Sequence, residues 1–283
     1  MNPAVNAYKT GWRRALIETR ISLATPSEVV GIVFPLALAV TVLLFLRGVD
    51  VDDSPVSLGS MNMPSLIGMM IVWGGALGVL STMLLDRTNG TMLRAKSMPG
   101  GMTGYLVGKL GMTALVTAFN VVVLLVVGLV FFDGVEFGSP DRWLLFLAVL
   151  ALGLVATIPL GAVLGALFDN PSSMALVMMP FMGLVAISGI FYPVTALPEW
   201  LQVIGQVFPT YWTGLGMRHA LLPDSAVAVE IGGDWRTLTM FIVLAAWAVA
   251  SLAFAPKLLS RMARRESGST MTARREKMQQ NWG

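Results

Sequence analysis

Six long stretches of this chain contain no Asp, Glu, Lys, Arg or His, and each is long enough to cross a bilayer. A hydrocarbon core about 30 Å thick requires about 17–25 helical residues, at a rise of about 1.5 Å per residue. The sequence therefore predicts an all-α membrane protein with six transmembrane helices. The predicted spans are Val29–Leu46, Ser65–Leu85, Leu110–Phe132, Trp143–Phe168, Met174–Tyr192 and Thr237–Ala255.

The composition agrees with this prediction and excludes several kinds of chemistry. Apolar residues make up 55% of the chain and charged residues 12%, against about 25% charged residues in soluble domains. Cysteine is absent, which excludes disulfides, a thiol nucleophile and a thiolate metal site. The six spans leave no room for a separate soluble catalytic domain. Residues 1–28 lack a continuous apolar run, so we expect no cleavable signal peptide.

Lysine and arginine are concentrated on one side of the predicted topology. Fifteen of the nineteen precede the first span, lie between residues 86 and 109, or follow the last span. The positive-inside rule then places both termini in the cytoplasm, at the plasma membrane. We interpret the basic tail, residues 256–283, as an anchor near anionic membrane lipid and expect no nucleic-acid partner. The basic residues on the outer side are Arg47, Arg142, Arg218 and Arg236.

Residues 1–28 are predicted to form an amphipathic helix that lies flat on the inner leaflet. Pro26 should end this helix, because the residue before a proline disfavours the α conformation. A cytoplasmic tail with chance periodicity is the alternative. The residues expected on the apolar face are Tyr8, Trp12, Ala15, Leu16, Thr19 and Leu23.

The last outer connection, residues 193–236, is unusually apolar for a loop that contains four prolines. Irregular backbone at membrane depth is tolerated only against protein or a water-filled cavity. We therefore expect a re-entrant hairpin of short broken helices in the outer mouth of the bundle. Its marker residues are Pro193, Pro198, Trp200, Pro209 and Tyr211.

The loop 86–104 carries a recognisable pattern. Residues 85–94 read Leu-Asp-Arg-Thr-Asn-Gly-Thr-Met-Leu-Arg, and Pro99, Gly108 and Lys109 follow. This pattern resembles the first cytoplasmic loop of ABC-2-type permeases, the membrane subunits of one class of ATP-binding-cassette exporters. Thr88 stands where that family more often has an acid. From the residues alone, Gly90 should break the preceding helix, and the Thr91 hydroxyl should cap a short new one.

A second set of motifs resembles the same family. Residues 188–193 read Ser-Gly-Ile-Phe-Tyr-Pro, residues 197–201 read Leu-Pro-Glu-Trp-Leu, and residues 208–212 read Phe-Pro-Thr-Tyr-Trp. They are similar to the end of the fifth span and the outer hairpin of ABC-2-type permeases. The resemblance covers essentially the whole chain, with residues 29–255 as its six-helix transmembrane domain.

The resemblance implies a permease that is not itself an enzyme. No P-loop sequence G-x-x-x-x-G-K-[ST] is present, so the chain should bind no cofactor, and ATP and magnesium should be held by a separate partner chain. The implied partners are two ATPase subunits and a second permease copy or close relative. The residues assigned to ATPase coupling are Asp86, Arg87, Gly90, Thr91, Leu93 and Arg94, with Trp12 and Arg13 in the N-terminal helix.

Asn120 is the only amide inside the six predicted spans, which contain no Asp, Glu, Lys, Arg or His. Such a side chain lines a substrate path or forms an interhelical hydrogen bond, and both alternatives stay open. Gly74-x-x-x-Gly78 and Gly161-x-x-x-Gly165 are interpreted as helix contacts within one subunit. The candidate substrate path consists of Asn120, Phe119, Trp73, Met69, Met182 and Phe191.

Two functions are compatible with these features. The first is the membrane subunit of an ATP-driven exporter for a hydrophobic or amphipathic substrate, such as a drug, antibiotic or lipid-like metabolite. The second is a stand-alone channel or ion-coupled transporter. Ion-coupled carriers normally hold the driving ion with an intramembrane charge, and the six predicted spans contain none. The sequence therefore favours the exporter.

Overall fold

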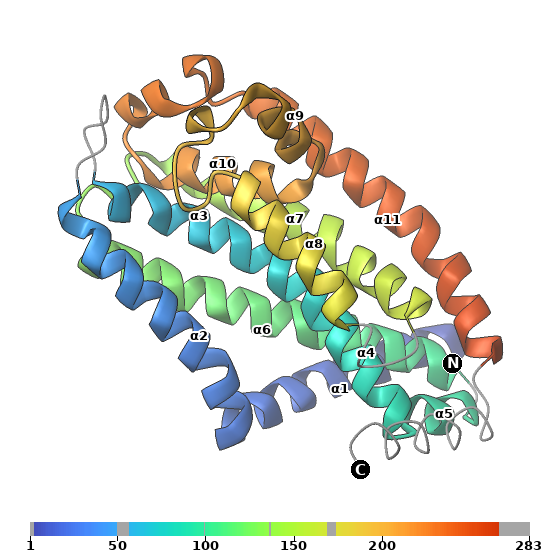
Figure 1. Ribbon diagram of the computed structural model, residues 1–283. Coiled ribbons are helices and arrows are strands. Elements are labelled where there is room, and N and C mark those ends of the chain that lie inside the picture. Colours follow the sequence, from blue (N-terminus) through green and yellow to red (C-terminus); the bar gives the residue numbers. More distant parts are fainter. Residues whose placement is uncertain (1–2, 50–56, 99, 136, 169–173, 266–283) are drawn as a thin grey trace, which may run out of the picture.

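The computed structural model describes residues 3–49, 57–98, 100–135, 137–168 and 174–265, and every regular element in these ranges is a helix. Figure 1 shows the helices as one bundle with α1 across its lower end. The predicted turn 169–173 and the tail after Arg265 lie outside the described residues. The α-helices are α1 (Pro3–Ala24), α2 (Pro26–Phe45), α3 (Leu58–Val72), α4 (Gly78–Thr88), α5 (Thr91–Lys96), α6 (Gly101–Phe131), α7 (Pro140–Leu167), α8 (Met174–Ile187), α9 (Glu199–Val207), α10 (Pro209–Leu221) and α11 (Thr237–Arg265).

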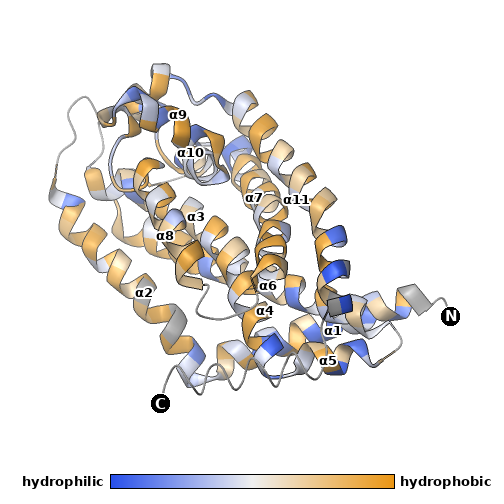
Figure 2. Cartoon of the chain, turned by 45° about the vertical axis from the view of Figure 1, so that its right-hand side comes forward, coloured by the Kyte–Doolittle hydropathy of each residue, from blue (hydrophilic) through white to orange (hydrophobic). Residues whose placement is uncertain are grey.

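Four helices of the described ranges are long and apolar enough to cross a membrane. Figure 2 shows that apolar residues dominate the long helices, whereas polar residues gather at α1, α5 and the last turns of α11. Two further apolar segments are shorter, Leu36–Gly48 and Met174–Ile187. The four long helices establish a multi-pass architecture. They are Leu58–Thr88, Gly101–Phe131, Pro140–Leu167 and Thr237–Met262.

Four predicted spans differ from their helices by five residues or more. The third begins at Gly101 instead of Leu110, and the sixth continues to Arg265 instead of ending at Ala255. The second begins at Leu58 instead of Ser65, because the Ser57 side chain accepts a hydrogen bond from the Ser60 amide and caps the helix there. The fifth ends at Ile187 instead of Tyr192. Gly189 has a φ of +67° just beyond that end, a left-handed conformation that glycine adopts without a steric cost.

The second long helix contains a π turn at Trp73–Leu77 that joins α3 to α4. The Gly78 amide donates to the Trp73 carbonyl, five residues earlier instead of four. Wider turns of this kind occur mostly as single bulges within α-helices. The helix is therefore continuous across its middle, but its winding changes there.

Glycines at this turn allow α3 and α4 to approach α6 and α7 closely. A Cβ atom at Gly74 would lie 2.9 Å from Thr117 Cγ2 of α6. A Cβ atom at Gly161 of α7 would lie 2.9 Å from Ala76 Cα. Both distances are too short for a side chain, so the prediction that these glycines form contacts within one chain is confirmed.

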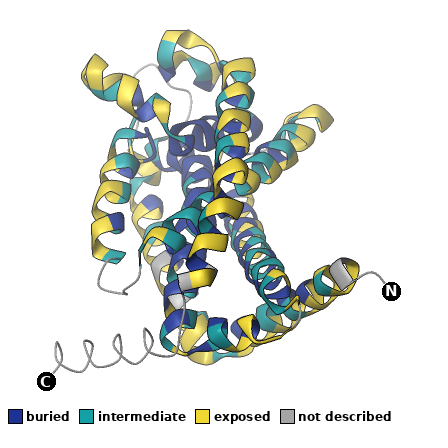
Figure 3. Ribbon diagram, turned by 90° about the vertical axis from the view of Figure 1, so that its right-hand side faces the viewer, coloured by how far each residue is buried: buried dark blue, intermediate teal, exposed yellow. Residues whose placement is uncertain are grey.

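The segment 193–236 forms short helices that pack on the bundle. Figure 3 shows a buried centre beneath exposed outer helices. Helix α10 is buried almost throughout, and Gly214 lies against Gly68 of α3. Helix α9 is largely exposed, with Trp200 at its surface, whereas Pro209 and Tyr211 are buried. The expected broken helices against the bundle are thus present, with Pro193 and Pro198 in the turns that lead to α9.

Candidate functional site

A sharp corner joins the second long helix to α5. Helix α4 ends at Thr88, and Gly90 has a φ of +72°. This conformation turns the chain, so the predicted break at Gly90 is confirmed. The predicted cap at Thr91 is wrong, because Gly90 itself occupies the N-cap position, without any side-chain capping bond, and Thr91 is the first residue of α5.

Lys109 ties three helices together beside this corner. Its ammonium group lies 2.9 Å from Asp86 Oδ2 of α4 and 3.2 Å from Glu18 Oε2 of α1. The lysine belongs to α6 and is buried. One cation therefore joins the N-terminal helix to the helix that leads into the corner.

Tyr105 and Arg14 complete this cluster. The Tyr105 hydroxyl donates a 2.9 Å hydrogen bond to Asp86 Oδ2, and Arg14 Nε donates a 2.5 Å bond to Glu18 Oε1. The Arg14 guanidinium also lies 5.6 Å from the centre of the Tyr105 ring, within the range of a cation–π contact. The five side chains Arg14, Glu18, Asp86, Tyr105 and Lys109 form what we term the α1–α4–α6 cluster.

The charge balance of the cluster keeps Glu18 ionised. Burial alone raises the pKa of the Glu18 carboxyl, but the hydrogen bond from Arg14 and the charges of Lys109 and Arg14 outweigh burial and hold its pKa below the ordinary value. Close opposite charges favour the ionised carboxyl in this way. Glu18 therefore faces Lys109 as a carboxylate at neutral pH.

Arg87 does not lie where the sequence interpretation placed it. The residue is only 1% exposed, and its Nη1 donates a 2.8 Å hydrogen bond to the Phe168 carbonyl at the end of α7. A buried guanidinium is not accessible to a partner chain. Arg87 is therefore an internal link between α4 and α7, and we remove it from the candidate partner contacts.

The exposed side chains at the same end come from α1 and α5. Arg94 is exposed and Leu93 is half-buried, whereas Met92 and Ala95 face the core. On α1, Arg13 is exposed and Trp12 is 48% exposed. These residues are on the surface of α1, which contributes to the cluster, and of α5, which follows α4 after the turn at Gly90.

Sequence reasoning missed Glu18, Tyr105 and Lys109 as a unit. Lys109 was named only as part of the pattern that follows the loop 86–104, and Glu18 was not singled out. The available signal was a lone lysine at the beginning of a long uncharged stretch. Such a charge is expected to find a carboxylate partner, but the sequence does not say which one.

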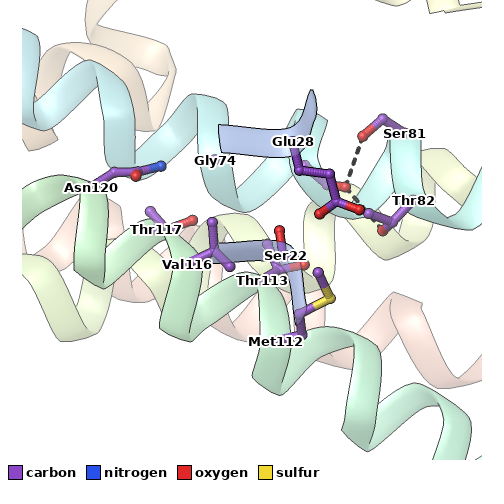
Figure 4. Close-up of a pocket in the computed structure, with 11 residues that line it drawn as sticks. Ser22, Glu28, Gly74, Ser81, Thr82, Met112, Thr113, Val116, Thr117 and Asn120 are labelled. Atoms are coloured by element: carbon purple, nitrogen blue, oxygen red, sulfur yellow. Dashed lines mark hydrogen bonds between the residues drawn. The ribbon is translucent and has the colours of Figure 1, made fainter. Parts of the chain in front are cut away.

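The predicted substrate-path residues do not converge on one cavity. Asn120 lines a cavity of about 310 Å³ between α1, α2, α4 and α6, shown in Figure 4 with Thr113 and Thr117 along the same helix. Its Oδ1 is buried and has no hydrogen-bond partner among the described residues. Phe191 lines a different cavity, of about 280 Å³. Trp73, Met69, Phe119 and Met182 line neither of them.

The second cavity reveals an amide that the sequence interpretation missed. Asn62 lies in α3 and is 1% exposed. It was missed because α3 begins seven residues before the predicted span. Its Nδ2 donates a 2.7 Å hydrogen bond to the Phe191 carbonyl, while its Oδ1 is buried without a partner in the described ranges. Asn120 is therefore not the only amide in the long helices.

A buried ion pair joins the outer helices. Arg218 of α10 contacts Glu230 through Nε at 2.5 Å and Nη2 at 3.1 Å. Its Nη1 donates to Ser65 Oγ at 2.8 Å and to the Gly189 carbonyl at 3.2 Å. One guanidinium thus links α10, α3, the end of α8 and the segment before α11. Four of the five guanidinium N–H groups thus have an acceptor, and the bidentate contact with Glu230 is the strong, charge-assisted kind.

The comparison with protein families decides what this architecture is. A family described as ABC-2 family transporter protein matches residues 30–255. The chain belongs to the ABC-2 family. No curated protein matches the chain at a significant level. An ABC-2 permease is the membrane component of an ABC transporter, which agrees with the four long apolar helices. Permeases of this family are transport subunits and not themselves catalytic.

Proposed function

We propose that this ABC-2 permease is the membrane subunit of an ATP-driven exporter, coupled to a separate ATPase through α1 and α5. The observation that most supports this proposal is the α1–α4–α6 cluster, in which Lys109 pairs with both Glu18 and Asp86. A force applied to α1 would reach α6 through the Glu18–Lys109 pair, and a force applied to α5 would reach α4 through the turn at Gly90 and then α6 through the Asp86–Lys109 pair. Two ATPase subunits, which hold ATP and magnesium, and a second permease complete the proposed complex.

In the proposed orientation the end with α1 and α5 faces the cytoplasm, and both termini lie there. Helix α1 lies along the inner leaflet, with Trp12 at the headgroups and Arg13 and Arg94 toward the ATPase. Helices α2 and α8 complete six spans, and α9 and α10 form a re-entrant outer hairpin. The last proposal is supported by the burial of α10 against α3 and α7.

The proposed cargo is hydrophobic or amphipathic, such as a drug, antibiotic or lipid-like metabolite. The cavity at Phe191 supports this class, because its walls are apolar except for the buried Asn62 amide, whose oxygen lacks a partner in the described ranges. An apolar molecule with a hydrogen-bond donor suits such a lining. The cavity at Asn120 is more polar, with Glu28 and several serines and threonines in its lining. Asn62 and Asn120 are the residues proposed to contact cargo.

The ATPase proposal is tested by affinity purification of the tagged full-length chain from its native membrane. Wild-type protein should retain a P-loop ATPase and its ATP hydrolysis, whereas Arg94→Glu should lose most of both while the permease stays inserted. Arg20→Glu is a matched control, because Arg20 is equally exposed but lies near the other end of α1.

Arg87→Glu is not a suitable test, since a carboxylate at this buried position would damage the fold. The opposing result is uphill transport by the purified chain alone in vesicles. That outcome would favour the stand-alone or ion-coupled transporter and would contradict the exporter proposal.

A further inference from the structure

The cavity at Asn120 contains an acidic side chain to which no role has been assigned. Glu28 lies in the first turn of α2 and lines this cavity of about 310 Å³. It is exposed, and no cation lies within ion-pair distance of it in the described ranges. Among the eleven lining residues Glu28 is the only charged one. The cavity therefore has an acidic group that the protein leaves without a counter-charge.

The cations of the neighbouring helices are engaged elsewhere or lie outside the lining. Lys109, the only lysine or arginine of α6, pairs with the two carboxylates of the α1–α4–α6 cluster. Arg87, the only one of α4, contacts the Phe168 carbonyl. Arg20 of α1 is exposed and does not line the cavity. A ligand with a positive charge would therefore not meet a like charge in the lining.

The polar atoms that accompany Glu28 are hydrogen-bond acceptors. Figure 4 shows Glu28 on the side of Ser81 and Thr82, away from Asn120. The hydroxyls of Ser81 and Thr82 each donate a 3.0 Å hydrogen bond to the Gly78 carbonyl, so their oxygens can only accept from a ligand. Farther along, Asn120 Oδ1 is buried without a partner among the described residues. These groups match a ligand that donates several hydrogen bonds.

The remaining walls are largely apolar and extend along α6. The α6 residues of the lining run from Met112 to Asn120, about 12 Å along the axis at a rise of about 1.5 Å per residue. Met112 and Val116 contribute alkyl surface between the polar ends. Glu28 directly precedes an uncharged stretch of α2. The acidic end of the cavity therefore lies at the edge of the apolar layer, and the rest of the cavity extends into it.

We propose that this cavity binds an amphipathic amine, with its ammonium group at Glu28 and its apolar body along Met112 and Val116 toward Asn120. An ammonium group has donors only and a positive charge, whereas a carboxylate or phosphate would bring like charge and further acceptors to the same atoms. An inorganic ion would leave the apolar walls unfilled. The described residues also contain no cluster of three or more acidic or histidine side chains for a metal. The inference rests on the proposed exporter function and names the cargo class of this cavity.

The test is equilibrium dialysis of three radiolabelled ligands against the purified full-length permease in detergent, without an ATPase. Naphthylethylamine, naphthylethanol and naphthylacetate share one ring system and differ in charge. Wild-type protein should bind the amine about tenfold more tightly than the alcohol and should bind the acid least, because a hydrogen bond between charged groups is the stronger one. Glu28→Gln should lower the affinity for the amine by about tenfold and leave that for the alcohol unchanged.

Two matched controls separate the site from general effects. Glu199 is also an exposed acid in the first turn of a helix, α9, and does not line the cavity, so Glu199→Gln should bind the amine as wild-type protein does. Val116→Trp fills the cavity and should abolish binding of the amine and the alcohol. Val122→Trp, at an exposed position of α6 outside the lining, should change neither. Thermal unfolding of each variant identifies any loss of binding that follows from misfolding.

Three results would overturn the proposal. They are equal affinity of wild-type protein for the amine and the alcohol, unchanged amine binding by a folded Glu28→Gln variant, and displacement of the amine by millimolar sodium, which would assign the site to an inorganic cation. Because no ATPase is present, these results are separate from the affinity purification. Loss of amine binding leaves the ATPase coupling in place, whereas a permease that binds the amine but retains no ATPase contradicts the exporter alone.

Discussion

Replacing Lys109 by methionine removes the cation at the centre of the α1–α4–α6 cluster while keeping an unbranched side chain of similar length. Loss of one partner from a buried ion pair costs about 3–5 kcal/mol. Here the Asp86 and Glu18 side chains are 14% and 22% exposed, and each keeps another partner, Tyr105 or Arg14. We therefore expect a loss of about 2–3 kcal/mol, at or below the lower end of that range.

The absence of cysteine allows a direct assay of this loss. A spin label on Thr10→Cys, an exposed position of α1, reports the mobility of that helix, and thermal unfolding in detergent reports the stability. Lys109→Met should raise the mobility of the label and lower the unfolding temperature. Adding Asp86→Asn should recover part of the stability, because one of the two uncompensated carboxylates is then removed.

Lys257→Met is the control, since this lysine is exposed on α11 and its loss should change stability by less than about 0.5 kcal/mol. The reasoning about the cluster is refuted if Lys109→Met matches this control in both unfolding and label mobility.

Three further predictions concern packing, the outer ion pair and pH. Gly161→Ala should destabilise the protein by about 1–3 kcal/mol in thermal unfolding, because its Cβ meets the backbone of Ala76. Gly183→Ala, which meets nothing within 4 Å, should be neutral or slightly stabilising, and equal effects of the two would contradict the packing. Arg218→Met should lower the stability by about 3–5 kcal/mol, because it leaves the buried Glu230 carboxylate without its partner. Replacing Glu230 as well should restore most of this stability, and a double variant with no recovery of stability would contradict the pair. The lowered pKa of Glu18 means that its contribution is complete above its ordinary value near 4.5 and is lost as the pH falls through the lowered pKa. Acid should therefore release α1 in wild-type protein more than in Glu18→Gln, and identical label mobility in both would exclude that role.

The sequence predicted the features that depend on composition and on local backbone rules. The long uncharged helices, the end of α1 before Pro26 and the break at Gly90 all follow from such rules. The start of α3 was missed, since it depends on a single cap at Ser57 within a polar segment. Element ends of this kind are the least certain part of a pattern-based prediction.

The candidate site was predicted only in part, because ion pairs join residues far apart in the sequence. Asp86 was identified from its loop, but its partner Lys109 is on another helix. Arg87 is next to Asp86 in the same charged loop pattern and was predicted to contact the ATPase, but its side chain is buried. Adjacent charged residues on a helix point in different directions, and only the packing of α4 against its neighbours determines which one reaches the surface.

The π turn at Trp73–Leu77 has a geometric consequence for the long helix Leu58–Thr88. One additional residue per turn offsets the side chains beyond it by about 100° from the α-helical register. The half before the turn presents Gly68 to α10, and the half after it presents Met83 to Gly165 of α7. Rewinding this turn to α-helical geometry would rotate the two halves against each other without breaking the helix, so twisting at one membrane face need not be transmitted unchanged to the other.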